Sequence, residues 1–238
     1  MAQIDTETSV SSEKSEVVNY KSLKTLVMKK IAFLFTLLCA IGTQQVSAQK
    51  LNAHSIDSAA VVNTILSRRS VRKYKDNPVR RDHMDMILKC GINAPSGMNA
   101  QPWEVRVVDN QKMLKDITEA QLKGMNEEQR KRATGDGFRN MFRNAPTVVF
   151  VAVPQGRGEL DSGILCENMV LAAWSMGVGS CILGGPVRFL NTDDAGKEFV
   201  KKLDFSEGYE LIYAIGFGYP DESPAAKPRD ERKVKYVE

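Results

Sequence analysis

The sequence lacks the patterns by which several common classes of protein are recognised. It contains neither a Rossmann glycine fingerprint nor a Walker sequence, so neither motif predicts a nucleotide site. Its 238 residues include only two histidines and no Cys-x-x-Cys pair, which argues against a structural zinc site. The net charge is only +4, and no basic face with interleaved aromatic residues accompanies it. Composition therefore gives no reason to expect a nucleic-acid partner.

Cysteine usage also predicts no disulfide framework. The four cysteines are Cys39, Cys90, Cys166 and Cys181, and Cys39 lies in an N-terminal apolar segment that precedes the expected domain. The other three are an odd number without paired spacing, so each is expected to pack as a small apolar side chain. The chain is long enough to bury the core of one domain behind a leader.

The leader has two parts. Residues 1–27 are polar and without an apolar period, so they are expected to be disordered, or to result from a start assigned too early. Residues 28–48 begin with lysines, continue as a short apolar run and end at the small-residue site before Gln49, which fits a secretory signal peptide. We therefore expect an exported, periplasmic protein. A cytoplasmic or membrane-anchored protein is the alternative, and lipidation of Cys39 is disfavoured because the bulky Leu38 precedes it.

The folded domain is expected over residues 55–232, where helical and strand patterns alternate. Residues 146–154 form a β-branched run that is typical of a strand buried on both faces. The conformation of residues 124–144 is left open. The expected helices span residues 55–66, 80–93, 110–123 and 161–176, the first capped by Ser55, and the expected strands span residues 104–108, 146–154 and 210–218.

The helix expected at residues 161–176 is apolar on nearly every side. Such a helix is buried all round, either in the centre of one subunit or against a partner. The period alone does not separate these two alternatives.

A basic run follows the first helical pattern. Arg68, Arg69, Ser70 and Arg72 place three guanidinium groups and a hydroxyl within five residues. The planar fork of arginine matches a phosphate with two hydrogen bonds, so the run predicts a site for a phosphate monoester. The alternative is a solvated helix end.

Three further segments carry candidate binding residues. Pro95, Ser96 and Asn99 lie in a loop that can hydrogen-bond a polar heterocycle, although such a segment can equally be an ordinary loop. The glycines at 184 and 185 follow a short strand and let the backbone approach a ligand closely. Lys227 and Arg229 follow the last strand, and on their own they would be solvated charges.

Together these motifs resemble the nitroreductase family of flavin enzymes. In that family an Arg-x-Ser-x-Arg/Lys segment and a Pro-Ser-x-x-Asn-x-Gln-Pro-Trp segment bind FMN, and both match here at Arg68–Arg72 and Pro95–Trp103. The resemblance covers about residues 56–229. It implies an α+β, three-layer fold with a mainly antiparallel central sheet flanked by helices, and an intertwined homodimer with the flavin at its interface. The implied FMN-binding residues are Arg68, Arg69, Ser70, Arg72, Pro95, Ser96, Asn99, Leu183, Gly184, Gly185, Lys227 and Arg229.

The resemblance also implies an activity. Family members transfer electrons by a ping-pong mechanism from NAD(P)H through FMN to a nitroaromatic, a quinone or a similar acceptor. No side chain need act as nucleophile or general base, so no catalytic residue is predicted. The signal peptide conflicts with this reading, because NAD(P)H is scarce outside the cytoplasm. An exported flavin-binding or carrier protein, or a flavoenzyme with another electron donor, is therefore the alternative.

Overall fold

The computed structural model of the protein describes residues 57–238, which form one compact unit, Asp57–Glu238. The predictions for residues 1–27, for the signal peptide at 28–48 and for the Ser55 cap lie outside the described residues. Within residues 57–238, no helix has the length and apolar character needed to cross a membrane.

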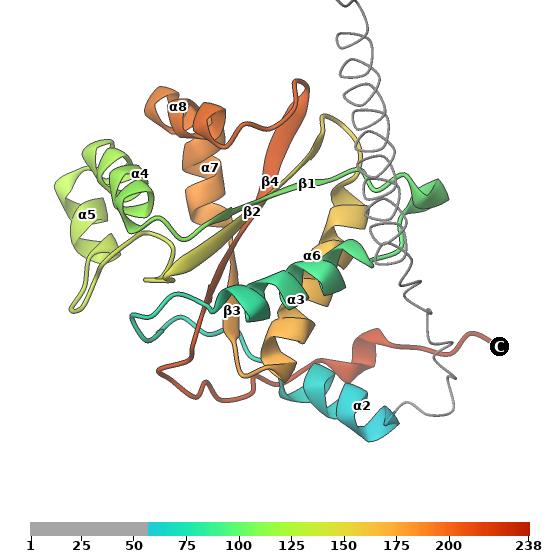
Figure 1. Ribbon diagram of the computed structural model, residues 1–238. Coiled ribbons are helices and arrows are strands. Elements are labelled where there is room, and N and C mark those ends of the chain that lie inside the picture. The colour runs from blue at the N-terminus through green and yellow to red at the C-terminus, as the bar shows by residue number, and fades with distance from the viewer. Residues whose placement is uncertain (1–56) are drawn as a thin grey trace, which may run out of the picture. The chain divides into compact units, whose positions relative to one another are not determined.

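A single antiparallel sheet lies at the centre of the fold (Figure 1). Its strands are β1 (Glu104–Val108), β2 (Thr147–Pro154), β3 (Gly179–Leu183) and β4 (Tyr209–Gly218), in the order β1-β2-β4-β3. The last strand of the chain therefore lies between β2 and β3 and pairs with both. The predicted antiparallel sheet is confirmed.

Helices cover both faces of this sheet. Alternate residues of β2 belong to different apolar clusters, because successive side chains of a strand point to opposite faces. Val148 and Phe150 pack with residues of α4 (Gln111–Lys123) and α7 (Gly184–Thr192), whereas Val149 and Val151 pack with residues of α3 (Arg81–Ile92) and α6 (Glu159–Ser175). The predicted three-layer α+β fold is therefore confirmed. The helices are α2 (Ser58–Ser67), α3 (Arg81–Ile92), α4 (Gln111–Lys123), α5 (Glu127–Ala133), α6 (Glu159–Ser175), α7 (Gly184–Thr192) and α8 (Asp194–Lys202), with short 3-10 turns at Gly97–Asn99 and Glu231–Lys233.

The side chain of Asp57 caps α2, the first helix that the structure describes. Its carboxylate accepts a hydrogen bond from the backbone N–H of Ala60 at 3.2 Å, which satisfies a free donor of the first turn. Residues 124–144, whose conformation the sequence left open, contain α5 followed by turns. The helices α7 and α8 are additional to the predicted elements.

One side of α6 packs tightly against α3. Gly91 of α3 allows this approach, because a Cβ there would lie 2.5 Å from Cγ of Met169. On the other side of α6, Leu160 is 80% exposed and Ile164 is 36% exposed. Residues 57–238 therefore do not bury this helix all round.

The segment that follows α2 is tied to β3 and to the chain after β4. The backbone N–H of Val71 donates to the Ser180 carbonyl at 2.9 Å, and that of Lys75 donates to the Tyr219 carbonyl at 2.9 Å. These hydrogen bonds bring the basic run beside the C-terminal segment.

Candidate functional site

The basic run and the C-terminal segment enclose a small cavity of about 130 Å³, called here the basic cavity. Six of the predicted binding residues line it together. In the sequence its two halves are more than 150 positions apart, which is about 0.6 of the chain length. Its volume suits one compact anion. The lining residues are Arg68, Arg69, Ser70, Arg72, Pro224, Ala225, Lys227 and Arg229.

Hydrogen bonds to the backbone hold the arginines of this cavity. One guanidinium nitrogen of Arg69 donates to the carbonyls of Leu66 and Arg68, each at 2.8 Å, and so satisfies acceptors at the end of α2. Arg72 donates to the Ser70 carbonyl at 3.0 Å. The run is thus ordered by its own carbonyls, which keeps the cationic groups close together.

Two carboxylates that the sequence did not indicate also support the cavity. Nε of Arg68 lies 3.9 Å from Oε1 of Glu167 on α6, and the two side chains are 25% and 51% exposed. Oε1 of Glu222 accepts hydrogen bonds from the backbone N–H groups of Arg72 and Lys73. Both contacts join segments far apart in the chain, so no local pattern could have revealed them.

A larger cavity of about 520 Å³ lies next to the first and shares Arg72 with it. We call it the turn cavity, because the predicted residues Leu183, Gly184 and Gly185 line it where β3 ends and α7 begins. A Cβ added at either glycine would meet no atom within 4 Å. The chain itself therefore leaves open space at this turn, which allows the backbone to approach a ligand closely. The other lining residues include Cys181 and positions between 132 and 144.

The thiol of Cys181 lies in the wall of the turn cavity. Burial raises its pKa, and the positive charges of Arg72 and Arg143 offset only part of that rise. The thiol is therefore neutral at pH 7, where thiolate would be the reactive form.

Pro95, Ser96 and Asn99 line neither of these two cavities. Their loop lies at the start of α6, where the backbone N–H of Gly97 donates to Asp161 at 3.4 Å. The indole N–H of Trp174, on the same helix, donates at 2.9 Å to Ser67, the residue before the basic run. Asp161 and Trp174 are about 20 Å apart at the helical rise of 1.5 Å per residue. A single chain therefore does not bring this loop to the cavities.

The backbone of this loop is strained. Met98, Asn99 and Gln101 have φ values of 53°, 55° and 46°, a region that side chains with a Cβ rarely adopt. The Met98 side chain is fully exposed, so the part of the chain that the structure describes gives it no packing. Strain of this kind costs about 1–3 kcal/mol per residue and persists where contacts over-determine it. An additional partner or ligand would provide such contacts.

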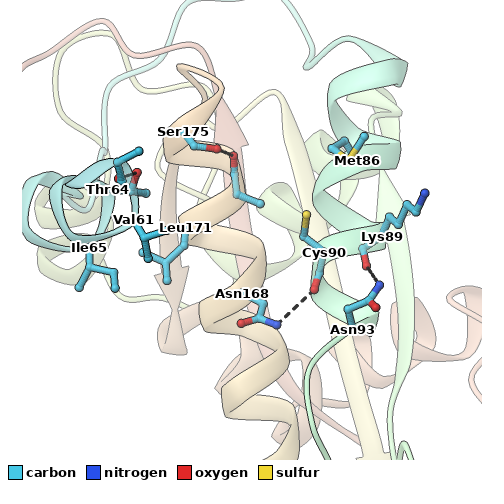
Figure 2. Close-up of a pocket in the computed structure, with 12 residues that line it drawn as sticks. Val61, Thr64, Ile65, Met86, Lys89, Cys90, Asn93, Asn168, Leu171 and Ser175 are labelled. Atoms are coloured by element: carbon cyan, nitrogen blue, oxygen red, sulfur yellow. Dashed lines mark hydrogen bonds between the residues drawn. The ribbon is translucent and has the colours of Figure 1, made fainter. Parts of the chain in front are cut away.

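An apolar groove of about 610 Å³ runs between α2, α3 and α6. Figure 2 shows Val61 and Ile65 of α2 on one side, Met86 of α3 on the other, and Leu171 of α6 beside Val61. No residue of α2 is buried, and Val61 and Ile65 are each about half exposed. This apolar groove is thus a surface that the described chain does not cover.

A three-layer α+β fold with an arginine-lined, anion-sized cavity beside a larger one defines a protein suited to hold a phosphate-bearing ligand. Residues 65–219 match the nitroreductase family, and the chain belongs to that family. It is 28% identical to an NADPH-flavin oxidoreductase of Vibrio harveyi over 174 residues, which cover 71% of this chain and 69% of the relative.

Solved structures agree with this assignment. A nitroreductase with bound FMN from Desulfitobacterium hafniense superposes with a TM-score of 0.67 at 30% identity, over 75% of this chain and 98% of the other. A second nitroreductase with bound FMN, from Bacteroides fragilis, gives a TM-score of 0.64 at 26% identity, over 75% and 98%.

Proposed function

We propose that this protein is an FMN-dependent oxidoreductase that takes electrons from NAD(P)H and passes them to a nitroaromatic, a quinone or a similar acceptor. The observation that carries the proposal is the basic cavity, where two distant motifs of a nitroreductase-family chain converge on a volume suited to one phosphate group. Relatives named for NAD(P)H and neighbours crystallised with FMN support the choice of donor and cofactor.

The donor set of the basic cavity fits the phosphate of FMN. Arg68, Arg72, Lys227 and Arg229 would neutralise its two negative charges, and the Ser70 hydroxyl would donate a hydrogen bond. Arg69 would act mainly by ordering the end of α2, because its guanidinium already donates to two backbone carbonyls. Glu167 and Glu222 would hold the arginine segment in position. Each carboxylate has a partner in that segment, so neither would face the anion unpaired.

The turn cavity would receive the ring of the cofactor and the molecule that reacts with it. When bound, FMN supplies the redox chemistry, and the protein supplies binding, orientation and electrostatics. The turn at 184 and 185 would offer backbone N–H groups to the ring. Arg72 lines both cavities, so its positive charge would stabilise negative charge on the phosphate and on the ring. Because the electron donor and the acceptor would share one cavity, they would bind one after the other, as in a ping-pong mechanism.

A homodimer would complete this site. We propose that the Ser96 and Asn99 loop acts on the flavin bound by a second copy, since it does not reach the cavities of its own chain. The exposed side of α6 and the apolar groove offer an uncovered apolar surface for that contact. Burying apolar area at about 25 cal/mol per Å² would stabilise the association. Pairing would also provide packing for the strained loop.

The experiment that tests the function is an absorbance spectrum of residues 49–238, followed by anaerobic addition of NADH or NADPH. We expect a flavin spectrum that bleaches on addition and recovers with a nitroaromatic or a quinone. Flavin that binds without bleaching would favour the second candidate, an exported flavin-binding or carrier protein or a flavoenzyme with another donor, which the signal-like segment at 28–48 motivates. Absence of flavin after reconstitution would overturn both.

A further inference from the structure

We propose that Arg143, with Arg132, recognises an anionic group, a phosphate or a carboxylate, on the small molecule that binds in the turn cavity. This inference rests on the proposed function and specifies the substrate class of that same site. Both arginines belong to the segment between α4 and β2, outside the motifs assigned to the flavin.

The lining of the turn cavity is strongly cationic. Its charged side chains are Arg72, Lys73, Arg132 and Arg143, against the single carboxylate of Asp136. Arg72 is shared with the basic cavity and is assigned there to the phosphate of the cofactor. Three cations therefore remain beside one acid. A cleft lined by one sign of charge raises the local concentration of ligands of the opposite sign.

Arg143 is the principal candidate to contact the anion. It is exposed, and within residues 57–238 it forms neither an ion pair nor a hydrogen bond through its side chain. Its φ is 58° and that of Asn144 is 62°, a conformation that is uncommon for arginine. A strained residue with a free cationic group in the wall of a cavity is typical of a binding position.

Asn144 fixes the backbone that presents Arg143. Its carboxamide oxygen accepts hydrogen bonds from the backbone N–H groups of Arg139 at 2.7 Å and Asn140 at 3.1 Å. Its amide nitrogen donates to the Gly137 carbonyl at 2.8 Å. The turn is therefore ordered before any ligand binds, which lowers the entropic cost of holding an anion there.

Arg132 has a secondary role. It pairs with Glu128 one turn earlier on α5, so part of its charge is already compensated. The start of α5 is fixed by a reciprocal pair of hydrogen bonds between Asn126 and Gln129. Arg132 is thus held near the cavity, and its loss should matter less than that of Arg143.

The anionic group has two possible sources, the phosphates of the nicotinamide donor and a carboxylate on the acceptor. Matched pairs of substrates distinguish them. NADPH is compared with 1-benzyl-1,4-dihydronicotinamide, a hydride donor without phosphate, and 4-nitrobenzoate is compared with the neutral 4-nitrobenzamide. The variants are Arg143→Gln and Arg132→Gln. Lys131→Gln on α5 is the control, because it removes the same charge from a neighbouring residue that does not line the cavity.

We expect Arg143→Gln to lower kcat/KM about tenfold for the anionic member of at least one pair, as loss of one charge-assisted hydrogen bond predicts. The neutral member should change less than about twofold, since no charged contact is lost. Arg132→Gln should give a smaller loss, and Lys131→Gln none. A loss with NADPH alone assigns the anion to the donor, and a loss with 4-nitrobenzoate alone assigns it to the acceptor.

Equal effects on the anionic and neutral members of both pairs would overturn the inference. A second readout needs no turnover: calorimetric titration of the oxidised protein with benzoate and with benzamide. Benzoate should bind more tightly than benzamide. This preference should shrink as the salt concentration rises and should be smaller in Arg143→Gln. Equal binding of benzoate and benzamide would contradict the proposal. A protein that bleaches with the neutral donor but shows no preference for anions would keep the proposed function and lose only this inference.

Discussion

Among residues 57–238, Arg72 alone lines both cavities, and with Arg68 it carries the main residue-scale prediction. Replacing both by Ala should weaken FMN binding by at least about 3 kcal/mol, because each charge-assisted hydrogen bond contributes roughly 1.5–3 kcal/mol. That loss corresponds to a rise in Kd of at least about 150-fold. Fluorescence titration of the apoprotein with FMN measures it.

The matched control is Arg81→Ala, at an exposed arginine of α3 that lines neither cavity. Its Kd for FMN should stay within about twofold of the unmodified protein, since no phosphate contact is lost. The Kd of Arg229→Ala for FMN should lie between those of the control and the double variant, because Arg229 is a single exposed cation of the cavity. Unchanged flavin affinity in the double variant would place the phosphate elsewhere.

Cys166 makes a second residue-scale prediction, which concerns pH. Burial, aided by the neighbouring charge of Glu167, raises the pKa of its thiol from 9.0 to about 12. Between pH 9 and about pH 12 the folded state keeps the thiol proton, whereas the unfolded chain loses it. The stabilisation of the folded state that is present below pH 9 is therefore lost as pH rises toward 12. At pH 10 the loss should be about 1.4 kcal/mol.

Urea unfolding at pH 8 and pH 10 checks this value. From pH 8 to pH 10, the free energy of unfolding should fall by about 1.4 kcal/mol less in Cys166→Ala than in the unmodified protein, because the titrating group is gone. Val170→Ala is the control, as a buried residue of the same helix without a titratable group, and it should keep the full pH dependence. Tyr74, whose pKa is also raised by burial, contributes in the same direction to all three proteins.

At the scale of elements, α2 is an apolar helix of which residues 57–238 bury no side chain. If a second copy covers the apolar groove, Ile65→Lys should place a charge in an apolar contact and convert the dimer to monomers. The single chain should still fold, because Ile65 is 51% exposed in it. Light scattering after size-exclusion chromatography gives the mass.

Glu119→Lys is the control for this substitution. It lies on α4, which packs on the opposite face of the sheet from α3 and α6, so it should leave the dimer intact. The Ile65→Lys monomer should also bind less flavin, because the loop with Ser96 and Asn99 would no longer be supplied. A dimer of unchanged mass would show that the contact lies elsewhere.

Elements with a strong local signal could be predicted from the sequence. The β-branched run at 146–154 became β2, and the alternation at 104–108 became β1, because burial on a sheet imposes a period that residues display directly. The segment 124–144 and the helices α7 and α8 could not be assigned, since charged and glycine-rich stretches leave the choice to tertiary contacts.

The candidate site shows the same division. The two basic motifs named six residues that the fold brings into one cavity, whereas Glu167 and Glu222 carried no signal, because their contacts depend on how distant segments pair. Ser96 and Asn99 line neither cavity of the described chain, and the proposed dimer would bring them to the flavin of a second copy.

At the scale of the whole molecule, the sequence predicts export. We propose that residues 28–48 direct secretion and are removed, so N-terminal sequencing of the protein from a secretion-competent bacterium should begin at Gln49. Ala48→Arg should block cleavage, because the site requires small residues. An unprocessed chain that fractionates with membranes would instead support the anchored alternative, and an unprocessed chain in the cytoplasmic fraction would contradict export.

The basic cavity takes one wall from residues just after α2 and the other from residues that follow β4, near the C-terminus. A growing polypeptide has the first wall early but gains the second only when the last part of the chain has left the ribosome. FMN bound in the basic cavity, as proposed, would therefore bind a chain whose C-terminal segment is already made, and it would stabilise that folded structure. Flavin content would then report on intact C-termini, and a chain trimmed before Pro224 should retain less flavin, because it lacks Lys227 and Arg229.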